Sequence, residues 1–215
     1  MNMNQPHAAL IAELAETLEP VRAMKARDGI MLVALAAAVT VLAVWLAVGI
    51  REGITTGSAS PFFFITNGLL LVLAMAATAV AVALAGPSIG RRTDAATWAI
   101  AMVGILPLTA LASALPFGES VSLLIDPHSF YCLVSAVAAS LLSFAVLAAW
   151  LRRGAPVSTP AAGLFAGVAA GAIGSFAYGL SCQIDTLAHL GVWHVLPVLV
   201  AGLAGLLLLP RIIRW

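Results

Sequence analysis

Long apolar runs separated by short polar segments make up most of the chain after residue 28. A helix needs about 20 apolar residues to cross a hydrocarbon core about 30 Å thick. The runs reach that length and lack the alternation of membrane-spanning strands. Pro107 and Pro197 lie within two of them and are expected to kink those helices. The pattern predicts an all-α polytopic membrane protein with six transmembrane helices, at residues 29–50, 62–86, 95–117, 129–151, 161–181 and 190–209.

Composition narrows the classes of function. Hydrophobic residues make up 62% of the 215 residues and charged residues 9%, too few charges to cover a soluble domain of this size. The net charge of +1 gives no reason to expect direct nucleic-acid binding. None of the six runs contains Asp, Glu, Lys or Arg, which argues against ion-coupled transporters and proton pumps. No HExxH, GxSxG or phosphate-loop motif is present.

Basic residues alternate between the two ends of the predicted helices. The N-terminal tail, the second and fourth loops and the C-terminus hold nine of the ten lysines and arginines, and the tenth is Arg51. Cytoplasmic segments of membrane proteins are enriched in these residues. We therefore expect both termini in the cytoplasm and loops one, three and five on the outer side of a bacterial inner membrane. The nine residues are Arg22, Lys25, Arg27, Arg91, Arg92, Arg152, Arg153, Arg211 and Arg214.

The fifth predicted helix carries a small residue at every fourth position. This spacing places the small residues on one helix face, where a neighbouring backbone can approach closely. We expect the face to pack inside the bundle or between protomers of a homo-oligomer, and a substrate path along it is the less favoured alternative. Its members are Gly163, Gly167, Gly171, Ser175 and Gly179.

Two cysteines lie at the outer ends of the fourth and fifth predicted helices. Cys132 is 24 residues before the centre of the connecting loop, near Pro156, and Cys182 is 26 residues after it. At a rise of about 1.5 Å per residue, the two thiols reach nearly the same depth. One interpretation is that they pack as small apolar side chains. The other is a thiol pair at an oxidising face, which forms a disulfide or binds a soft metal ion.

Polar residues near the cysteines are candidate auxiliary ligands, namely His128, Asp185 and His189. No two histidines have the i, i+4 spacing of a metal-binding pair on one helix. The favoured interpretation of His7, His128, His189 and His194 is therefore polar residues of the tail or of the membrane interface. No permanent cofactor is expected, and a soft metal ion at the cysteines would be transient.

Residues 1–28 form the one sizeable segment outside the apolar runs, and they combine an apolar and an acidic helix face. A helix of about ten residues is marginal alone in water, so we expect it to order on a partner. A helix lying on the membrane is the alternative, but such helices usually carry Lys or Arg on their polar face. The apolar face consists of Leu10, Ile11, Leu14 and Leu18, and the acidic face of Glu13, Glu16 and Glu19.

Short motifs that follow one another along nearly the whole chain resemble the NrsF-type negative regulators, which are membrane-bound anti-sigma factors. Two positions depart from the family pattern: Ser181 stands where a His is expected, and His194 where a Tyr is expected. The matching motifs are Leu14-Ala15-Glu16-Thr17-Leu18-Glu19-Pro20-Val21-Arg22, Tyr131-Cys132-Leu133, Arg152-Arg153-Gly154-Ala155-Pro156, Tyr178-Gly179-Leu180-Ser181-Cys182, Asp185, Val192-Trp193-His194 and Arg214-Trp215.

The resemblance implies no catalysis, and it implies different roles for two parts of the chain. The tail, residues 1–28, would hold an extracytoplasmic-function sigma factor, with its leucines as anchors and its glutamates steering the partner. Residues 29–215 would form the transmembrane domain, in which Cys132 and Cys182 are linked to release of the sigma factor under heavy-metal or oxidative stress. The alternative function is a small membrane carrier or channel for a neutral or thiol-ligated metal species, with the cysteines as entry ligands.

Overall fold

The computed structural model describes residues 5–16, 24–87, 127–184 and 186–213, together with residues 94, 97–98, 100–101, 104–105 and 108. The regular secondary structure of these residues is helical, and it includes five helical stretches long and apolar enough to cross a membrane. The elements are α1 (Gln5–Glu16), α2 (Ala26–Val48), α3 (Glu52–Thr56), α4 (Pro61–Leu84), α7 (Pro127–Arg153), α8 (Thr159–Gly179), α9 (Leu187–Trp193) and α10 (Leu196–Ile212).

Most of the predicted third span, residues 95–117 with Pro107, lies outside the described residues. A sixth span therefore stays a prediction. The segment that contains this predicted span joins α4 to α7, whose connected ends lie at opposite ends of the bundle. The end of α7 lies beside the end of α4, where the amide of Ala155 donates to the carbonyl of Ala85 at 2.8 Å. The 27-residue helix α7 therefore begins about 40 Å from the end of α4.

Local sequence explains where several helices begin. The side chain of Ser60 accepts a hydrogen bond from the amide of Phe63, and Pro61 occupies the first turn of α4. Ser158 does the same for the amide of Ala161 at the start of α8. A hydroxyl at the N-cap satisfies an unpaired helix amide, and proline is tolerated in the first turn because its missing N–H would have no helical partner.

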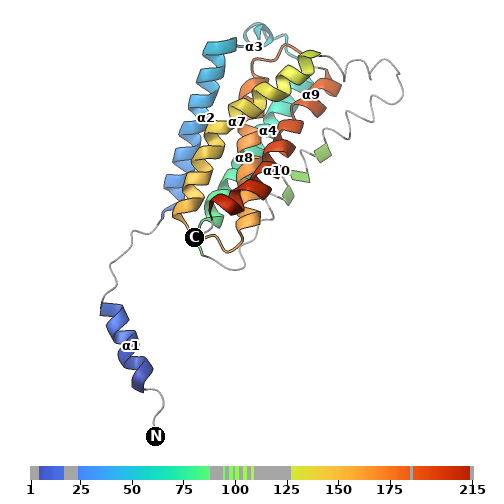
Figure 1. Ribbon diagram of the computed structural model, residues 1–215. Coiled ribbons are helices and arrows are strands. Elements are labelled where there is room, and N and C mark those ends of the chain that lie inside the picture. The colour runs from blue at the N-terminus through green and yellow to red at the C-terminus, as the bar shows by residue number, and fades with distance from the viewer. Residues whose placement is uncertain are drawn as a thin grey trace.

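Helix α8 is the axis of the bundle, with α10, α7 and α4 packed around it (Figure 1). Sixteen of its 21 residues are buried. Helix α2 lies at the edge of the bundle, mainly against α7. Near the start of α2, Gly29 fits closely against the ring of Trp150, whose indole N–H donates to the carbonyl of Val82 at 3.3 Å.

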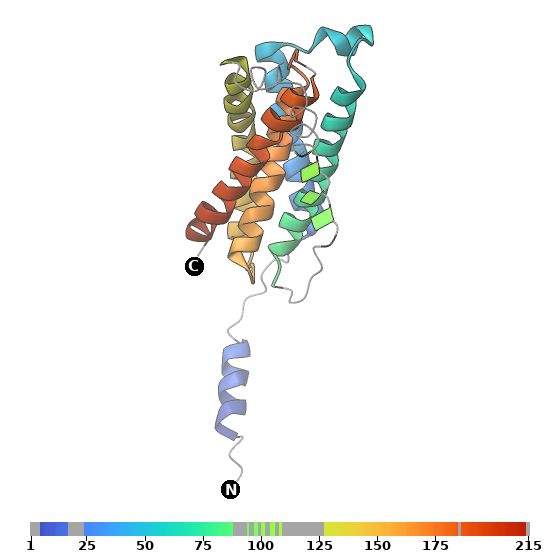
Figure 2. The same cartoon turned by 90° about the vertical axis from the view of Figure 1, so that its right-hand side faces the viewer.

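Helix α1 stands clear of the bundle, on the side where α10 ends (Figures 1 and 2). Helices α3 and α9 lie at the opposite end of the bundle. The residues of α1 from 8 to 16 are all exposed, including Leu10, Ile11 and Leu14. Leu18 and Glu19 of the predicted tail faces lie outside the described residues.

The predicted last helix, residues 190–209, is not continuous. Helix α9 ends at Trp193, His194 and Val195 form a turn, and α10 begins at Leu196 with Pro197 in its first turn. Proline lacks the N–H that would continue the hydrogen-bond ladder and its ring crowds the preceding turn. The chain is therefore broken just before Pro197, where the sequence indicated only a kink.

Small residues on α8 allow three neighbouring helices to approach its backbone. Gly163 and Gly167 meet the backbone of α10 at Gly205 and Ala201. Gly171 also faces α10, Gly179 faces the side chain of Asn67 on α4, and Ser175 is fully buried. Gly174, which lies off the every-fourth-residue face, meets the backbone of α7 at Ala136 and Ser140. No room is left for a Cβ at these glycines.

We predict that Gly167→Ala destabilises the bundle by about 1–3 kcal/mol, the usual cost of overpacking a filled core. A Cβ at this position would lie 2.8 Å from the carbonyl carbon of Ala201 and 2.9 Å from the Cα of Gly202. Unfolding of the purified protein by SDS in mixed micelles measures the change. Gly68→Ala on α4 is the matched control, because a Cβ there meets nothing within 4 Å. Equal stability of the two variants would contradict the packing argument.

Candidate functional site: a buried cluster of two cysteines and two histidines

Four side chains that can bind metal converge at the end of the bundle opposite α1. They are Cys132, Cys182, His189 and His194, and their ligand atoms all lie within 4.8 Å of one another. Each residue is at most 3% exposed. Buried titratable groups gathered at one point are uncommon in an otherwise apolar bundle, because each is costly to bury without a partner.

Helix α7 supplies Cys132 from its second turn. Ser129, Cys132 and Ala136 lie on one helix face and are buried, whereas Phe130 and Tyr131 are exposed. Spacings of three and four residues bring side chains to the same side of a helix. The buried face of α7 therefore turns the Cys132 thiol toward the bundle.

Cys182 follows the end of α8 directly. Its amide donates to the carbonyl of Tyr178 at 3.2 Å, which closes a turn after Gly179. Its own carbonyl accepts a hydrogen bond from Nη1 of Arg51 at 3.4 Å, and the amide of Arg51 donates to the carbonyl of Leu180 at 3.1 Å. The segment that carries Cys182 is thus attached both to α8 and to Arg51, which lies in the short connection between α2 and α3.

The two histidines come from the short helix α9 and the turn after it. Thr186 caps α9 by accepting the amide of His189 at 3.3 Å. The rings of His189 and His194 meet edge to face, with centroids 5.5 Å apart, and His194 stacks against Tyr178 at 6.5 Å. Both ring nitrogens of His194 are buried and have no hydrogen-bond partner among the described residues.

The thiols of the cluster contact each other and one histidine ring. The Sγ atoms of Cys132 and Cys182 are 3.8 Å apart, and Cys182 Sγ is 3.5 Å from His189 Nε2. On the other side of its ring, His189 Nδ1 is 3.1 Å from the hydroxyl of Ser129. That hydroxyl holds the ring so that Nε2 faces the thiols.

The cysteines are not joined in a disulfide, since their sulfur atoms are in van der Waals contact rather than bonded. The hydrogen bond with Cys132 lowers the pKa of Cys182, burial raises it, and the hydrogen bond with His189 lowers it again. The neighbouring imidazole of His194 lowers the pKa of Cys182 further. The thiolate is the form of cysteine that binds metals and reacts with oxidants.

The sequence-based candidates divide into three groups. Cys132, Cys182 and His189 lie together in the cluster, whereas His128 is exposed one turn before Cys132. Asp185 lies outside the described residues. His189 and His194, which were expected as polar residues of the tail or of the membrane interface, are 2% and 1% exposed and lie inside the cluster. The signal that could have found His194 is Pro197, which breaks the helix and turns the preceding residues inward.

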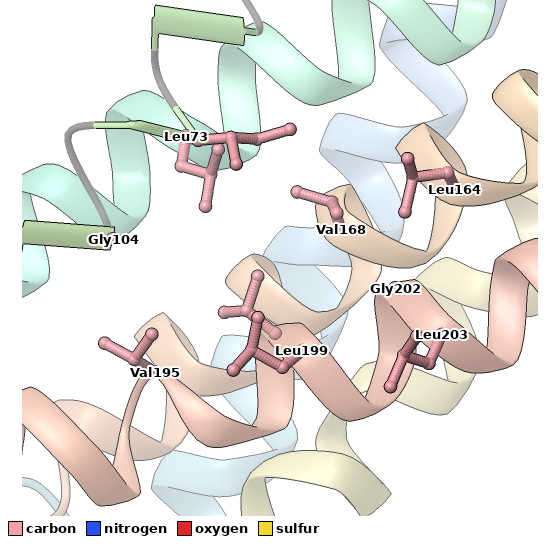
Figure 3. Close-up of a pocket in the computed structure, with 10 residues that line it drawn as sticks. Leu73, Gly104, Leu164, Val168, Val195, Leu199, Gly202 and Leu203 are labelled. Carbon is pink, nitrogen blue, oxygen red and sulfur yellow. The ribbon is translucent and has the colours of Figure 1, made fainter. Parts of the chain in front are cut away.

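A pocket of about 370 Å³ lies between α4, α8 and α10 (Figure 3). The side chains around it, including Leu73, Val168 and Leu199, are apolar. Among the described residues that line the pocket, none has a donor or acceptor side chain for a polar or ionic cargo. The metal-binding side chains lie in the Cys/His cluster and not among the residues that line this pocket.

Comparison with known proteins identifies the family of the chain. No curated protein and no solved structure matches the chain. The family described as "NrsF: Negative regulator of sigma F" matches residues 14–215, which is nearly the whole chain and includes all four residues of the cluster. The resemblance inferred from the sequence is thereby confirmed. The chain belongs to the NrsF family of negative regulators of sigma F, whose members restrain a sigma factor and are not enzymes.

Proposed function

We propose that this protein is a membrane-bound anti-sigma factor that holds an extracytoplasmic-function sigma factor with its N-terminal tail. In this proposal the Cys/His cluster governs release of the sigma factor under metal or oxidative stress. The observation that carries the proposal is the family match over residues 14–215, which begins within α1 and runs through the cluster. The fold supports it by separating an exposed amphipathic helix from a buried thiol site.

The proposed orientation places α1 in the cytoplasm, where a sigma factor resides. Lys25, Arg27, Arg152, Arg153 and Arg211 belong to helix ends at the same end of the bundle as the tail. A cytoplasmic location of that end satisfies the positive-inside rule. The Cys/His cluster then faces the periplasmic side of the inner membrane, where oxidants and metal ions arrive first.

The tail has the form of a helix that docks into a groove. Leu10, Ile11 and Leu14 are 52%, 65% and 57% exposed, which is costly for leucine and isoleucine in water unless a partner covers them. Glu13 and Glu16 are exposed on the other side of the helix. They are placed to steer a basic surface of the sigma factor.

We predict that Leu14→Asp frees the sigma factor and raises transcription of its target genes without any stress. A charged side chain cannot enter the apolar groove, and loss of one buried anchor costs about 2 kcal/mol or more at a binding hot spot. A promoter fusion controlled by the sigma factor measures the change, with immunoblots to check protein levels. Ala9→Asp is the matched control, because it adds the same charge to the glutamate side of α1. Repression by Leu14→Asp equal to that of the wild type would refute the proposed tail contact.

The Cys/His cluster is placed to act as the sensor because it joins three separate segments of the chain. Cys132 belongs to α7, Cys182 follows α8, and His189 belongs to α9. Metal binding to the thiols, or their oxidation, would change the contacts between α7, the segment after α8, and α9. To switch most of the population, the stimulus must favour the releasing state by several kcal/mol over the holding state.

We predict that Cys132→Ser and Cys182→Ser each give a stably inserted protein that still represses but no longer responds to inducer. Serine keeps the approximate volume and removes the thiolate. Reporter transcription after challenge with cadmium, zinc or a thiol oxidant measures the response. Normal induction by both variants under every challenge would mean that the thiols only pack, and the sensor role would be wrong.

A further inference from the structure

We propose that Cys132, Cys182, His189 and His194 together form a closed tetrahedral site for one divalent ion of the zinc group, Zn²⁺ or Cd²⁺. This inference deepens the proposed function. Binding of an ion at the site does not depend on that function; only the effect of binding on release of the sigma factor rests on it. The novel element is His194, because the two cysteines alone would leave the ion half coordinated.

The donor set is that of a structural zinc site. Two thiolates and two imidazoles in tetrahedral arrangement are typical ligands of Zn²⁺. Two thiolates carry two negative charges, so a divalent ion makes the site neutral, which suits a buried position at the edge of a membrane. On binding, the two cysteine thiols release their protons to solvent and the imidazoles bind in their neutral form.

The distances in the structure match the edges of such a tetrahedron. With metal–sulfur bonds of about 2.3 Å and metal–nitrogen bonds of about 2.0–2.1 Å, the expected edges are about 3.8 Å between sulfurs and about 3.5 Å between sulfur and nitrogen. The sulfurs of Cys132 and Cys182 are 3.8 Å apart, and Cys182 Sγ is 3.5 Å from His189 Nε2. Two edges are therefore already at metal-binding length.

The environment of the histidines gives independent support. His194 is 1% exposed, and both its ring nitrogens lack a hydrogen-bond partner among the described residues. A buried polar atom without a partner is costly, and a metal ion would satisfy one of the two nitrogens. The hydroxyl of Ser129 contacts His189 Nδ1, which is the supporting contact that metal-binding histidines usually have.

Co²⁺ is a direct probe, because it takes the same ligands as Zn²⁺ and its visible absorption distinguishes tetrahedral from octahedral coordination. We expect the reduced, detergent-purified full chain to bind one Co²⁺ with tetrahedral visible bands and thiolate-to-cobalt charge transfer. Added Zn²⁺ should abolish both. His194→Phe, which keeps a buried aromatic ring, should lose the tetrahedral spectrum and bind at least about tenfold more weakly. His128→Phe is the matched control, because His128 is exposed and outside the cluster.

Two results would overturn the site: no Co²⁺ binding by the reduced wild-type protein, or a tetrahedral spectrum of His194→Phe identical to that of the wild type. Circular dichroism and size-exclusion chromatography of His194→Phe establish that the variant is folded, and His194→Gln provides a second test if it is not. Failure of the site differs from failure of the proposed function. A protein that binds Co²⁺ as expected but retains no sigma factor would refute only the latter.

A second inference concerns Arg51, which we infer to be a positioning residue that connects the cluster to α2. Arg51 lies three residues after the last residue of α2, as the N-cap of α3, and is 6% exposed. It makes the two hydrogen bonds to the carbonyls of Leu180 and Cys182, and its guanidinium lies 5.1 Å above the centre of the Phe63 ring. The backbone that carries one cysteine is therefore tied to the far end of α2.

Helix α2 extends this tie toward the tail. It runs without a break from Val48 back to Ala26, a length of about 35 Å over its 23 residues, and the tail precedes it. A rigid helix transmits a displacement of one end to the other, whereas a loop would absorb it. Two residues, Gly49 and Ile50, join Arg51 to α2, and the amide of Gly49 is fixed to the last turn of α2 by a 2.8 Å hydrogen bond to the carbonyl of Trp45. A shift of the Cys182 segment on ligation would therefore move the end of α2 through Arg51 and this short connection. This inference rests on the proposed function.

Arg51→Met should leave the Co²⁺ spectrum and uninduced repression unchanged but reduce induction at least about fivefold, a coupling of about 1 kcal/mol. Arg51→Lys keeps a charge and a donor and should restore at least half of the response. Arg211→Met is the matched control, since Arg211 also donates to a carbonyl, that of Leu207, but within its own helix. Full induction of Arg51→Met, or an Arg51→Lys variant as unresponsive as Arg51→Met, would contradict the coupling role. Loss of repression without inducer would instead point to a defect in tail binding.

Discussion

The close approach of α8 to its neighbours is the constraint on which the rest of the structure depends. Lipid is as apolar as the helix surfaces, so burial of hydrophobic side chains does not by itself hold helices together in a membrane. Packing and backbone proximity must do so instead. Glycines at 163, 167 and 171 bring α10 against α8, and Gly174 does the same for α7. With α8 held on these sides, the residues at its end have defined positions.

The Cys/His cluster is a consequence of that packing. Cys182 follows the end of α8 directly, and α7 is brought against α8 at the depth where its second turn presents Cys132. The break before Pro197 then folds α9 across the end of the bundle and adds two imidazoles. Four groups that would each be costly to bury alone are therefore buried together, where they can satisfy one another or a shared ion.

The two proposed working parts of the molecule lie at opposite ends of the bundle, so signalling between them must cross its length. Arg51 is the one lysine or arginine in the loops expected on the outer side. Its side chain is stabilised there by its hydrogen bond to Cys182 and its contact with the Phe63 ring. A buried guanidinium needs partners of this kind. The two hydrogen bonds of Arg51 connect the segment between α2 and α3 to the backbone around Cys182.

Much of the architecture was determined by the sequence alone, because it depends on local properties. The lengths of four apolar runs predicted α2, α4, α7 and α8 to within three positions, whereas the last run was predicted as one helix and is broken into α9 and α10. Counting along a helix placed Cys132 and Cys182 at one depth. Only the tertiary structure decided which way each helix turns about its axis and how the chain bends at its breaks. Those rotations bury His194 and leave His128 exposed, and they bring Arg51 to the Cys182 carbonyl. The reason is physical: spacing along the chain sets the height of a side chain, but its direction depends on packing against distant residues.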